Sequence, residues 1–230
     1  MQPIPDIMKR RPKITQLLVV DDHDVVREGL RALIKTESRW NICGEAADGR
    51  KAVELAKKLR PDIVLLDISM PELNGLEATR QIRKSLPNTE VLVLTVHESP
   101  VLAQEVYEAG GRGFIVKTDV KRFLIPALEC LAEHKPFFSS KISELILQGE
   151  PALAGAAPAM APRARQRLTS REMEVMQLVA EGRSNKEIAA TLGRSIKTVE
   201  AHRASIMRRL GLASVAELVR YAIRHKIVEG

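Results

Sequence analysis

Short apolar runs and amphipathic segments alternate along the first 135 residues of the chain. Strand-length runs of continuous apolar residues lie at 14–20, 63–66, 91–94 and 113–116, with a weaker run at 40–44. Continuity rather than alternation is typical of strands that are buried on both faces of a sheet. Apolar residues at helical spacing lie between them, in segments 26–34, 52–59, 101–106 and 123–131. Five strand–helix units in this order predict a doubly wound α/β domain with a five-stranded parallel sheet.

The last third of the chain carries only helix start and stop signals. Three capping boxes, in which Ser or Thr precedes Glu by three residues, lie at Thr169 and Glu172, Ser184 and Glu187, and Ser214 and Glu217. Ser195 can cap a further helix, and Gly182, Gly193 and Gly211 stand where helices should end. These signals predict four short helices near 170–181, 184–192, 195–210 and 214–226. The middle two are joined by a tight turn at 193–194, which is the signature of a helix-turn-helix.

A linker separates the two patterns. Residues 149–166 contain three prolines, two glycines and many alanines, without apolar periodicity. We therefore expect a disordered tail over 1–13, an α/β domain over 14–148, the linker over 149–166 and an all-α helix-turn-helix domain over 167–230.

The charge of the chain is concentrated at one end. Its 36 Lys and Arg exceed its 29 Asp and Glu by 7, and residues 163–230 hold 14 of the former against 7 of the latter. Residues 14–162 hold 18 against 21 and are slightly acidic. Such asymmetry indicates a polyanion as partner of the basic end, although a merely soluble basic surface would give the same count.

Composition excludes several classes of protein. Aromatic residues make up 3% of the chain, too few for the stacking platforms of single-strand nucleic-acid modules. Two cysteines cannot form a disulfide framework or a cysteine-rich zinc site. No apolar run approaches 18 residues and no leader pattern opens the sequence, so we expect a cytoplasmic protein without a membrane segment.

Polar residues follow the predicted strands where the strands end. Asp21 and Asp22 follow the first strand, Asp67 the third, Thr95 the fourth and Lys117 the fifth. The carboxyl ends of parallel strands meet at one edge, where open α/β sheets bind their ligands. Three crowded carboxylates favour a divalent cation, and oxygen ligands favour Mg²⁺. The set is suited to placing a phosphoryl group on Asp67, with Thr95 and Lys117 meeting its oxygens. Each residue alone is better explained by a solvated turn or an ordinary strand end, but the five together are not.

The motifs that carry these residues resemble a known family. Residues 14–135 are similar to a CheY-like receiver domain through Leu-Leu-Val-Val-Asp-Asp-His, Leu-Leu-Asp-Ile-Ser-Met-Pro-Glu-Leu-Asn-Gly, Val-Leu-Thr-Val-His and Gly-Phe-Ile-Val-Lys. Residues 167–227 are similar to a LuxR-type helix-turn-helix through Leu-Thr-Ser-Arg-Glu and Thr-Val-Glu-Ala-His-Arg. Together they resemble the NarL/FixJ class of bacterial two-component response regulators, which regulate transcription.

The resemblance assigns roles at the acidic edge. It implies that Asp67 accepts a phosphoryl group from a sensor histidine kinase, and that Mg²⁺ is held by Asp21, Asp22, Asp67 and the backbone carbonyl of Ser69. Lys117 would pair with the phosphoryl group. Thr95 would swing toward it and Phe114 would follow inward. Phosphorylation would then free the second domain or promote dimers.

The resemblance also identifies a recognition helix for double-stranded DNA. Val199, Ile206 and Leu210 share one face of the helix at 195–210, predicted to be the core side. The expected DNA-binding residues are Lys186, Lys197, Thr198, Glu200, Ala201, Arg203, Ala204 and Arg208, of which Glu200, Ala201 and Ala204 would read bases and the cations would contact phosphates. A solvated basic face is the alternative for the cations.

The last helix offers a dimer contact, with Val215, Leu218, Val219 and Ala222 at helical spacing. Part of that face must pack on its own domain. By resemblance the rest supports a homodimer when the protein is phosphorylated or DNA-bound.

Two other functions share some of these sequence features. An aspartyl-phosphate phosphatase would carry Asp-x-Asp where this chain has Asp67-Ile68-Ser69, so we do not expect an enzyme acting on an external substrate. A receiver whose helical domain binds protein instead of DNA is disfavoured by the uneven charge.

Overall fold

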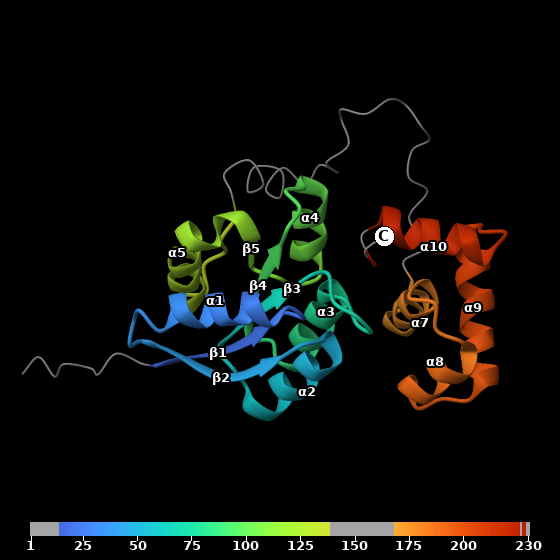
Figure 1. Cartoon of the computed structure of the whole chain (residues 1–230), viewed down its shortest axis with the longest axis horizontal. Coiled ribbons are helices and arrows are strands. Elements are labelled where there is room, and N and C mark those ends of the chain that lie inside the picture. Colours follow the sequence, from blue (N-terminus) through green and yellow to red (C-terminus); the bar gives the residue numbers. More distant parts are fainter. Residues whose placement is uncertain (1–13, 139–167, 226, 229–230) are drawn as a thin grey trace, which may run out of the picture.

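The computed structural model describes residues 14–138, 168–225 and 227–228, which form two units (Figure 1). The predicted tail at 1–13 and linker at 149–166 lie outside these residues. The first unit is α/β and the second is all helical, as the hydrophobic pattern predicted.

A five-stranded sheet forms the centre of the first unit. Its strands are β1 (Thr15–Val20), β2 (Trp40–Ala46), β3 (Ile63–Asp67), β4 (Glu90–Thr95) and β5 (Gly113–Val116). Every neighbouring pair is parallel, in the order β2-β1-β3-β4-β5. This order reverses direction between β1 and β3, and the crevice at such a switch point is where doubly wound sheets bind ligands. The predicted fold class is confirmed.

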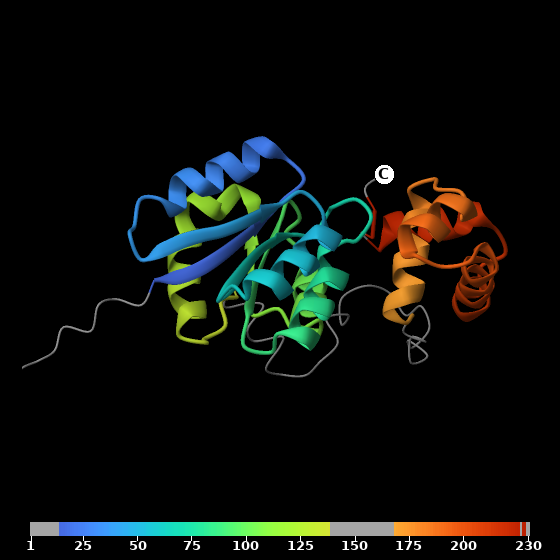
Figure 2. The same ribbon diagram turned by 90° about the horizontal axis from the view of Figure 1, so that it is seen from below.

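Helices cover both faces of the sheet (Figures 1 and 2). One face carries α1 (Asp24–Ile34) and α5 (Val120–Ala132), and the other carries α2 (Gly49–Leu59), α3 (Gly75–Ser85) and α4 (Pro100–Glu108). Because side chains alternate along a strand, Leu17 and Val19 contribute to one core cluster and Leu18 and Val20 to the other. Two layers of helices on an apolar sheet leave only the strand ends open for chemistry.

One helix of this unit, α3, has a weak sequence signal. Its large apolar residues are Leu76 and Ile82, whereas Glu77 and Thr79 are polar but buried. Its start is marked by Asn74, whose side chain accepts a hydrogen bond from the Glu77 amide at 3.0 Å.

The second unit consists of α7 (Ser170–Ala180), α8 (Asn185–Leu192), α9 (Ile196–Leu210) and α10 (Val215–Arg224) around one core cluster. The capping boxes at Thr169 and Ser184 are confirmed, and Ser195 caps α9 through the Thr198 amide. The third box is incomplete. Ser214 accepts from the Glu217 amide, but the Glu217 carboxylate binds the Ala213 amide instead of that of Ser214.

Candidate functional site

The predicted acidic edge is assembled at the carboxyl ends of three strands of the sheet, β1, β3 and β5. Asp21 follows β1 and Asp67 ends β3, and these strands pair directly. Lys117 follows β5, and its ammonium lies 2.7 Å from Asp21 Oδ2 and 3.0 Å from Asp67 Oδ2. Both carboxylates are buried, with 0% and 3% of their side chains exposed. The structure thus brings together one cation and two buried carboxylates that are distant in sequence.

Burial changes the titration of this cluster. Desolvation raises the pKa of Asp67 from 3.8 to about 6, the charge of Asp21 adds to the rise, and Lys117 opposes it. Burial by itself would lower the pKa of Lys117, but its hydrogen bonds and charge interactions with Asp21 and Asp67 outweigh burial and raise it. Lys117 therefore stays protonated at neutral pH, whereas burial makes the ionised form of Asp67 energetically unfavourable. A second cation next to Asp67 would stabilise that ionised form.

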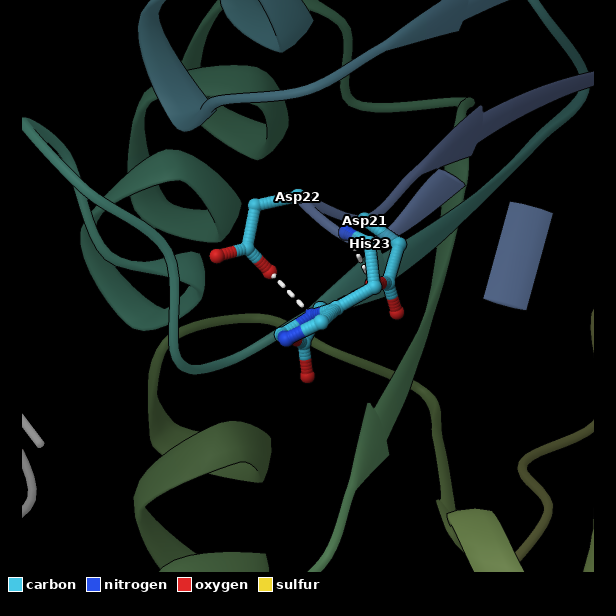
Figure 3. Close-up of side chains that lie close together, drawn as sticks. Asp21, Asp22 and His23 are labelled. Atoms are coloured by element: carbon cyan, nitrogen blue, oxygen red, sulfur yellow. Dashed lines mark hydrogen bonds and ion pairs between the residues drawn. The ribbon is translucent and has the colours of Figure 1, made fainter. Parts of the chain in front are cut away.

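Asp22 and His23 extend the cluster toward solvent (Figure 3). His23 Nδ1 lies 2.8 Å from Asp22 Oδ1, and the His23 amide donates to Asp21 Oδ1 at 2.9 Å. One ligand atom from each of Asp21, Asp22, His23 and Asp67 can be chosen so that all lie within 4.8 Å of one another. His23 is not among the site residues predicted from the sequence, although it directly follows the two aspartates.

The loop after Asp67 is folded tightly against the strand that carries it. The Ile68 amide donates to Asp67 Oδ1 at 2.9 Å, and the Gly75 amide donates to the Ile68 carbonyl at 2.9 Å. Ser69, the expected carbonyl ligand, lies in this loop and is half-buried. A Cβ at Gly75 would stand 2.1 Å from the Asp67 carbonyl oxygen. Only glycine allows this close approach.

We expect Gly75→Ala to destabilise the first unit by about 3 kcal/mol or more, because the added methyl meets backbone atoms that cannot move aside. The unfolding midpoint in urea measures the loss. Gly29→Ala on α1 is the matched control, since a Cβ there meets nothing within 4 Å and alanine favours a helix by about 1 kcal/mol. Equal stability of the two variants would contradict the expected clash.

The two predicted switch residues, Thr95 and Phe114, are both buried. Thr95 ends β4 and is buried, and its Oγ1 accepts a hydrogen bond from the His97 amide at 3.1 Å. Phe114 on β5 is only 5% exposed and belongs to the core cluster of α2, α3 and α4. Phe114 is thus buried in this structure, and its expected movement on phosphorylation stays a prediction.

In the second unit, α9 exposes the predicted DNA-binding face. Val199 and Ile206 are fully buried in the core and Leu210 packs against it, which confirms the predicted core side. Among the predicted DNA-binding residues, Lys186, Lys197, Glu200, Ala201, Ala204 and Arg208 are exposed, and Thr198 and Arg203 are half-buried. Both views place α9 on the side of its unit that faces away from the sheet (Figures 1 and 2).

Two polar contacts hold α9 in place. Glu172 at the start of α7 accepts a hydrogen bond from Ser205 Oγ at 2.6 Å, and Arg209 lies 3.3 Å from the same carboxylate. Arg203 donates to the side chain of Asn185 at the start of α8. Arg203 therefore has a role in orienting α9, in addition to the phosphate contact predicted for it.

The predicted dimer residues of α10 divide into two pairs. Leu218 and Ala222 are 1% and 0% exposed and lie in the core of their own unit, so their part in a dimer contact is corrected to a packing role. Val215 is exposed and Val219 is half-buried. The dimer contact remains a prediction for these two residues.

Within the described parts of the chain, none of the helices has the length and apolar character needed to cross a membrane.

Family models match both units. The model for the response regulator receiver domain matches residues 17–129, and the model for bacterial regulatory proteins of the luxR family matches residues 166–222. Each match includes one of the sites described above.

Similar proteins extend over nearly the whole chain. The transcriptional regulatory protein MctR of Rhizobium johnstonii is 35% identical over 221 residues, covering 96% of this chain and 98% of MctR. The transcriptional regulatory protein LiaR of Bacillus subtilis is 34% identical over 218 residues, covering 93% and 99%. Among solved structures, RcsB from Salmonella enterica serovar Typhimurium bound to promoter P1flhDC with the phosphomimetic BeF3- has a TM-score of 0.58 and 27% identity, covering 90% of this chain and 98% of RcsB. The relatives share both units and their order, so the chain belongs to the NarL/LuxR family of two-component response regulators and is a DNA-binding transcriptional regulator rather than a metabolic enzyme.

Proposed function

We propose that Asp67 is the phosphoacceptor and that its modification by a sensor histidine kinase controls DNA binding through the second domain. The observation that carries the proposal is the position of Lys117, whose ammonium lies 3.0 Å from the Asp67 carboxylate although it comes from the end of β5, two strands along the sheet from β3. An incoming phosphoryl group brings negative charge, and a fixed cation beside the acceptor stabilises that charge as it arrives.

The transfer is a displacement at phosphorus. An Asp67 carboxylate oxygen forms the new bond as the bond from phosphorus to the imidazole nitrogen of the kinase histidine breaks, and the imidazole takes up a proton from solvent. Lys117 holds its proton throughout. Thr95, buried at the end of β4, would contact a phosphoryl oxygen through its hydroxyl after the transfer.

The donor set fits Mg²⁺. Mg²⁺ prefers oxygen ligands, and the carboxylate oxygens of Asp21, Asp22 and Asp67 fall within 4.8 Å of one another, so that small side-chain movements would bring them around one ion. Asp22 and Asp67, with the Ser69 carbonyl, would hold the ion, and Asp21 would act nearby or through water. When bound, the ion supplies positive charge that offsets the crowded carboxylates and the phosphoryl oxygens.

We expect Mg²⁺ to raise the thermal unfolding midpoint of the protein. At 100 times the dissociation constant a ligand stabilises by about 2.7 kcal/mol, which corresponds to roughly 5–10 °C for a unit of this size. Asp22→Asn should lose most of that shift, because it removes a ligand charge. Asp24→Asn, two residues further on and exposed, removes the same charge and should keep it. A shift of equal size in both variants would contradict the proposed site.

The DNA partner is supported by the exposed face of α9 and by the concentration of charge in the second domain. It is also supported by solved DNA complexes of the similar protein RcsB. We propose that the active form is a homodimer with Val215 and Val219 at or near the contact between the two α10 helices. Two copies of α9 would then meet half-sites about one helical turn apart.

Selection of bound DNA from a random pool tests the function as a whole. The full chain is used with and without acetyl phosphate and Mg²⁺. We expect recovery of a site with two related halves, with tighter binding after acetyl phosphate treatment. If the pool shows no enrichment, or if DNA binding lacks a steep salt dependence, the result would favour the alternative in which the helical domain binds protein.

A further inference from the structure

The turn between β1 and α1, which carries Asp21 and Asp22, is held by an arginine outside the acidic cluster. Arg27 lies one turn into α1, and only 15% of its side chain is exposed. Its guanidinium reaches back toward the strand end, where Nη1 donates to the Asp21 carbonyl at 2.6 Å. A hydrogen bond from a charged donor is stronger than one between neutral groups. The turn that presents two of the three carboxylates is therefore tied to the helix that follows it.

The polar groups of Asp21 are all bound by other parts of the receiver. Its amide donates to the Ala46 carbonyl on β2 at 3.2 Å. One carboxylate oxygen accepts from the His23 amide at 2.9 Å, and the other lies 2.7 Å from the Lys117 ammonium. The carbonyl is the remaining group, and Arg27 is its partner. Without Arg27 this carbonyl would lose its hydrogen bond beside a fully buried side chain, which is costly.

Arg27 is itself anchored on the edge strand of the sheet. Its Nε lies 3.6 Å from Oε2 of Glu45 on β2, and its Nη2 contacts the exposed carboxylate of Asp24. Arg31, one turn further along α1, binds the same Glu45 through Nε at 3.0 Å and Nη2 at 2.8 Å. The two arginines thus share one carboxylate, and of the two it is Arg27 that extends to the Asp21 carbonyl.

The bond from Arg27 determines how the chain leaves β1. The Asp21 carbonyl belongs to the planar peptide group that joins Asp21 to Asp22, so fixing its direction also fixes the Asp22 amide and restricts where the Asp22 side chain can point. Asp22 depends on this restriction more than Asp21 does, because 28% of its side chain is exposed and packing holds it less firmly (Figure 3).

We propose that Arg27 is a positioning residue for Mg²⁺, which keeps the Asp22 carboxylate within the group of ligand atoms that lie within 4.8 Å of one another. The proposal rests on the proposed function, of which the Mg²⁺ site is a part. Groups that orient the ligands of a metal, without touching it, change its affinity by about 10–100-fold when they are removed.

Charge alone leads to the opposite expectation. A guanidinium this close to the acidic cluster repels a divalent cation, so removing it would strengthen Mg²⁺ binding if Arg27 acted only through its charge. Positioning predicts weaker binding. The sign of the change in Mg²⁺ affinity therefore distinguishes the two.

Mg²⁺ titration of the full chain tests the proposal, with binding followed by calorimetry and by the thermal unfolding midpoint. In Arg27→Met the dissociation constant for Mg²⁺ should rise about ten-fold. Arg31→Met is the matched control, because it removes the same charge from the same helix and the same partner, Glu45. Its dissociation constant should stay close to that of wild type.

Arg27→Lys keeps the charge and serves if Arg27→Met does not fold. An ammonium lacks the planar fork that spans the Asp21 carbonyl and the Glu45 carboxylate, so Mg²⁺ should still bind several-fold more weakly than in wild type. Because the charge is unchanged, this loss reports geometry alone.

Phosphorylation by acetyl phosphate gives a second measurement. In Arg27→Met it should require more Mg²⁺ and should reach the wild-type extent when Mg²⁺ is saturating, and a defect that persists at saturation would contradict the proposal. A merely structural role of Arg27 would lower the urea midpoint and leave the Mg²⁺ dissociation constant unchanged, which overturns it, as would tighter binding in Arg27→Met. Wild-type protein that binds no Mg²⁺ would contradict the proposed function and this proposal with it, whereas equal binding by wild type and Arg27→Met would contradict this proposal only.

Discussion

Asp67→Asn should abolish covalent phosphorylation of the chain. The amide has nearly the shape of the carboxylate and can still accept a hydrogen bond from Lys117, but it is not a nucleophile toward phosphorus. Wild-type protein incubated with acetyl phosphate and Mg²⁺ should gain one phosphoryl group by intact-mass measurement, and the variant should gain none.

A control at the other end of the same strand makes the result specific. Asp62 precedes β3 and accepts a hydrogen bond from the Gln16 amide at 2.8 Å, at the edge of the sheet opposite to Asp67. Asp62→Asn removes the same charge, and this variant should be phosphorylated to the same extent as wild type. A phosphoryl group found on Asp67→Asn would place the acceptor elsewhere, with Asp21 and Asp22 as the next carboxylates to examine.

The same substitution should stabilise the metal-free protein at neutral pH. The pKa of Asp67 is raised from 3.8 to about 6, so between these values the folded state holds a proton that the unfolded state has lost. Stability therefore falls as pH rises through this window, and the cost is fully present at pH 7. Asn has no charge to bury. The variant should unfold at higher urea than wild type at pH 7 in EDTA, with little difference near pH 4.

The fold and the acidic edge could be predicted because their signals are local or repeated. Continuous apolar runs identify strands buried on both faces, and parallel strands necessarily bring their carboxyl ends to one edge. Asp21, Asp67 and Lys117 could thus be placed together without any knowledge of distances. Helix starts in the second domain were equally accessible, because a capping side chain acts within three residues of sequence.

The features that escaped prediction depend on contacts between distant segments. Helix α3 buries Glu77 and Thr79, so its hydrophobic pattern is weak, and only the need for a crossover between β3 and β4 implies it. Phe114 has the same sequence signal whether its ring lies outward or inward. Gln177 has the sequence signal of a solvated residue on a surface helix, because nothing within α7 shows that its side chain bonds the Met70 carbonyl and the Asn74 amide of the receiver. Contact between two domains adds no periodic pattern of apolar residues to either sequence.

Double substitution of Lys197 and Arg208 by alanine should weaken DNA binding of the full chain at least ten-fold at physiological salt. Both residues are exposed on α9, and neither belongs to the core, so folding should be retained. For each phosphate contact that is lost, DNA binding releases about one fewer counterion. The slope of log affinity against log salt should therefore fall by about 2.

The matched control removes two charges from the receiver instead. Lys57 and Lys58 are exposed on α2, and alanine at both positions changes the net charge by the same amount. If DNA were attracted by net charge alone, the two double variants would lose equal affinity with equal change in slope. Contact through α9 predicts a large loss for Lys197 and Arg208 and almost none for Lys57 and Lys58. Base preference should survive in the weakened variant, because the proposed base-reading residues Glu200, Ala201 and Ala204 are unchanged, and phosphate contacts only position the helix.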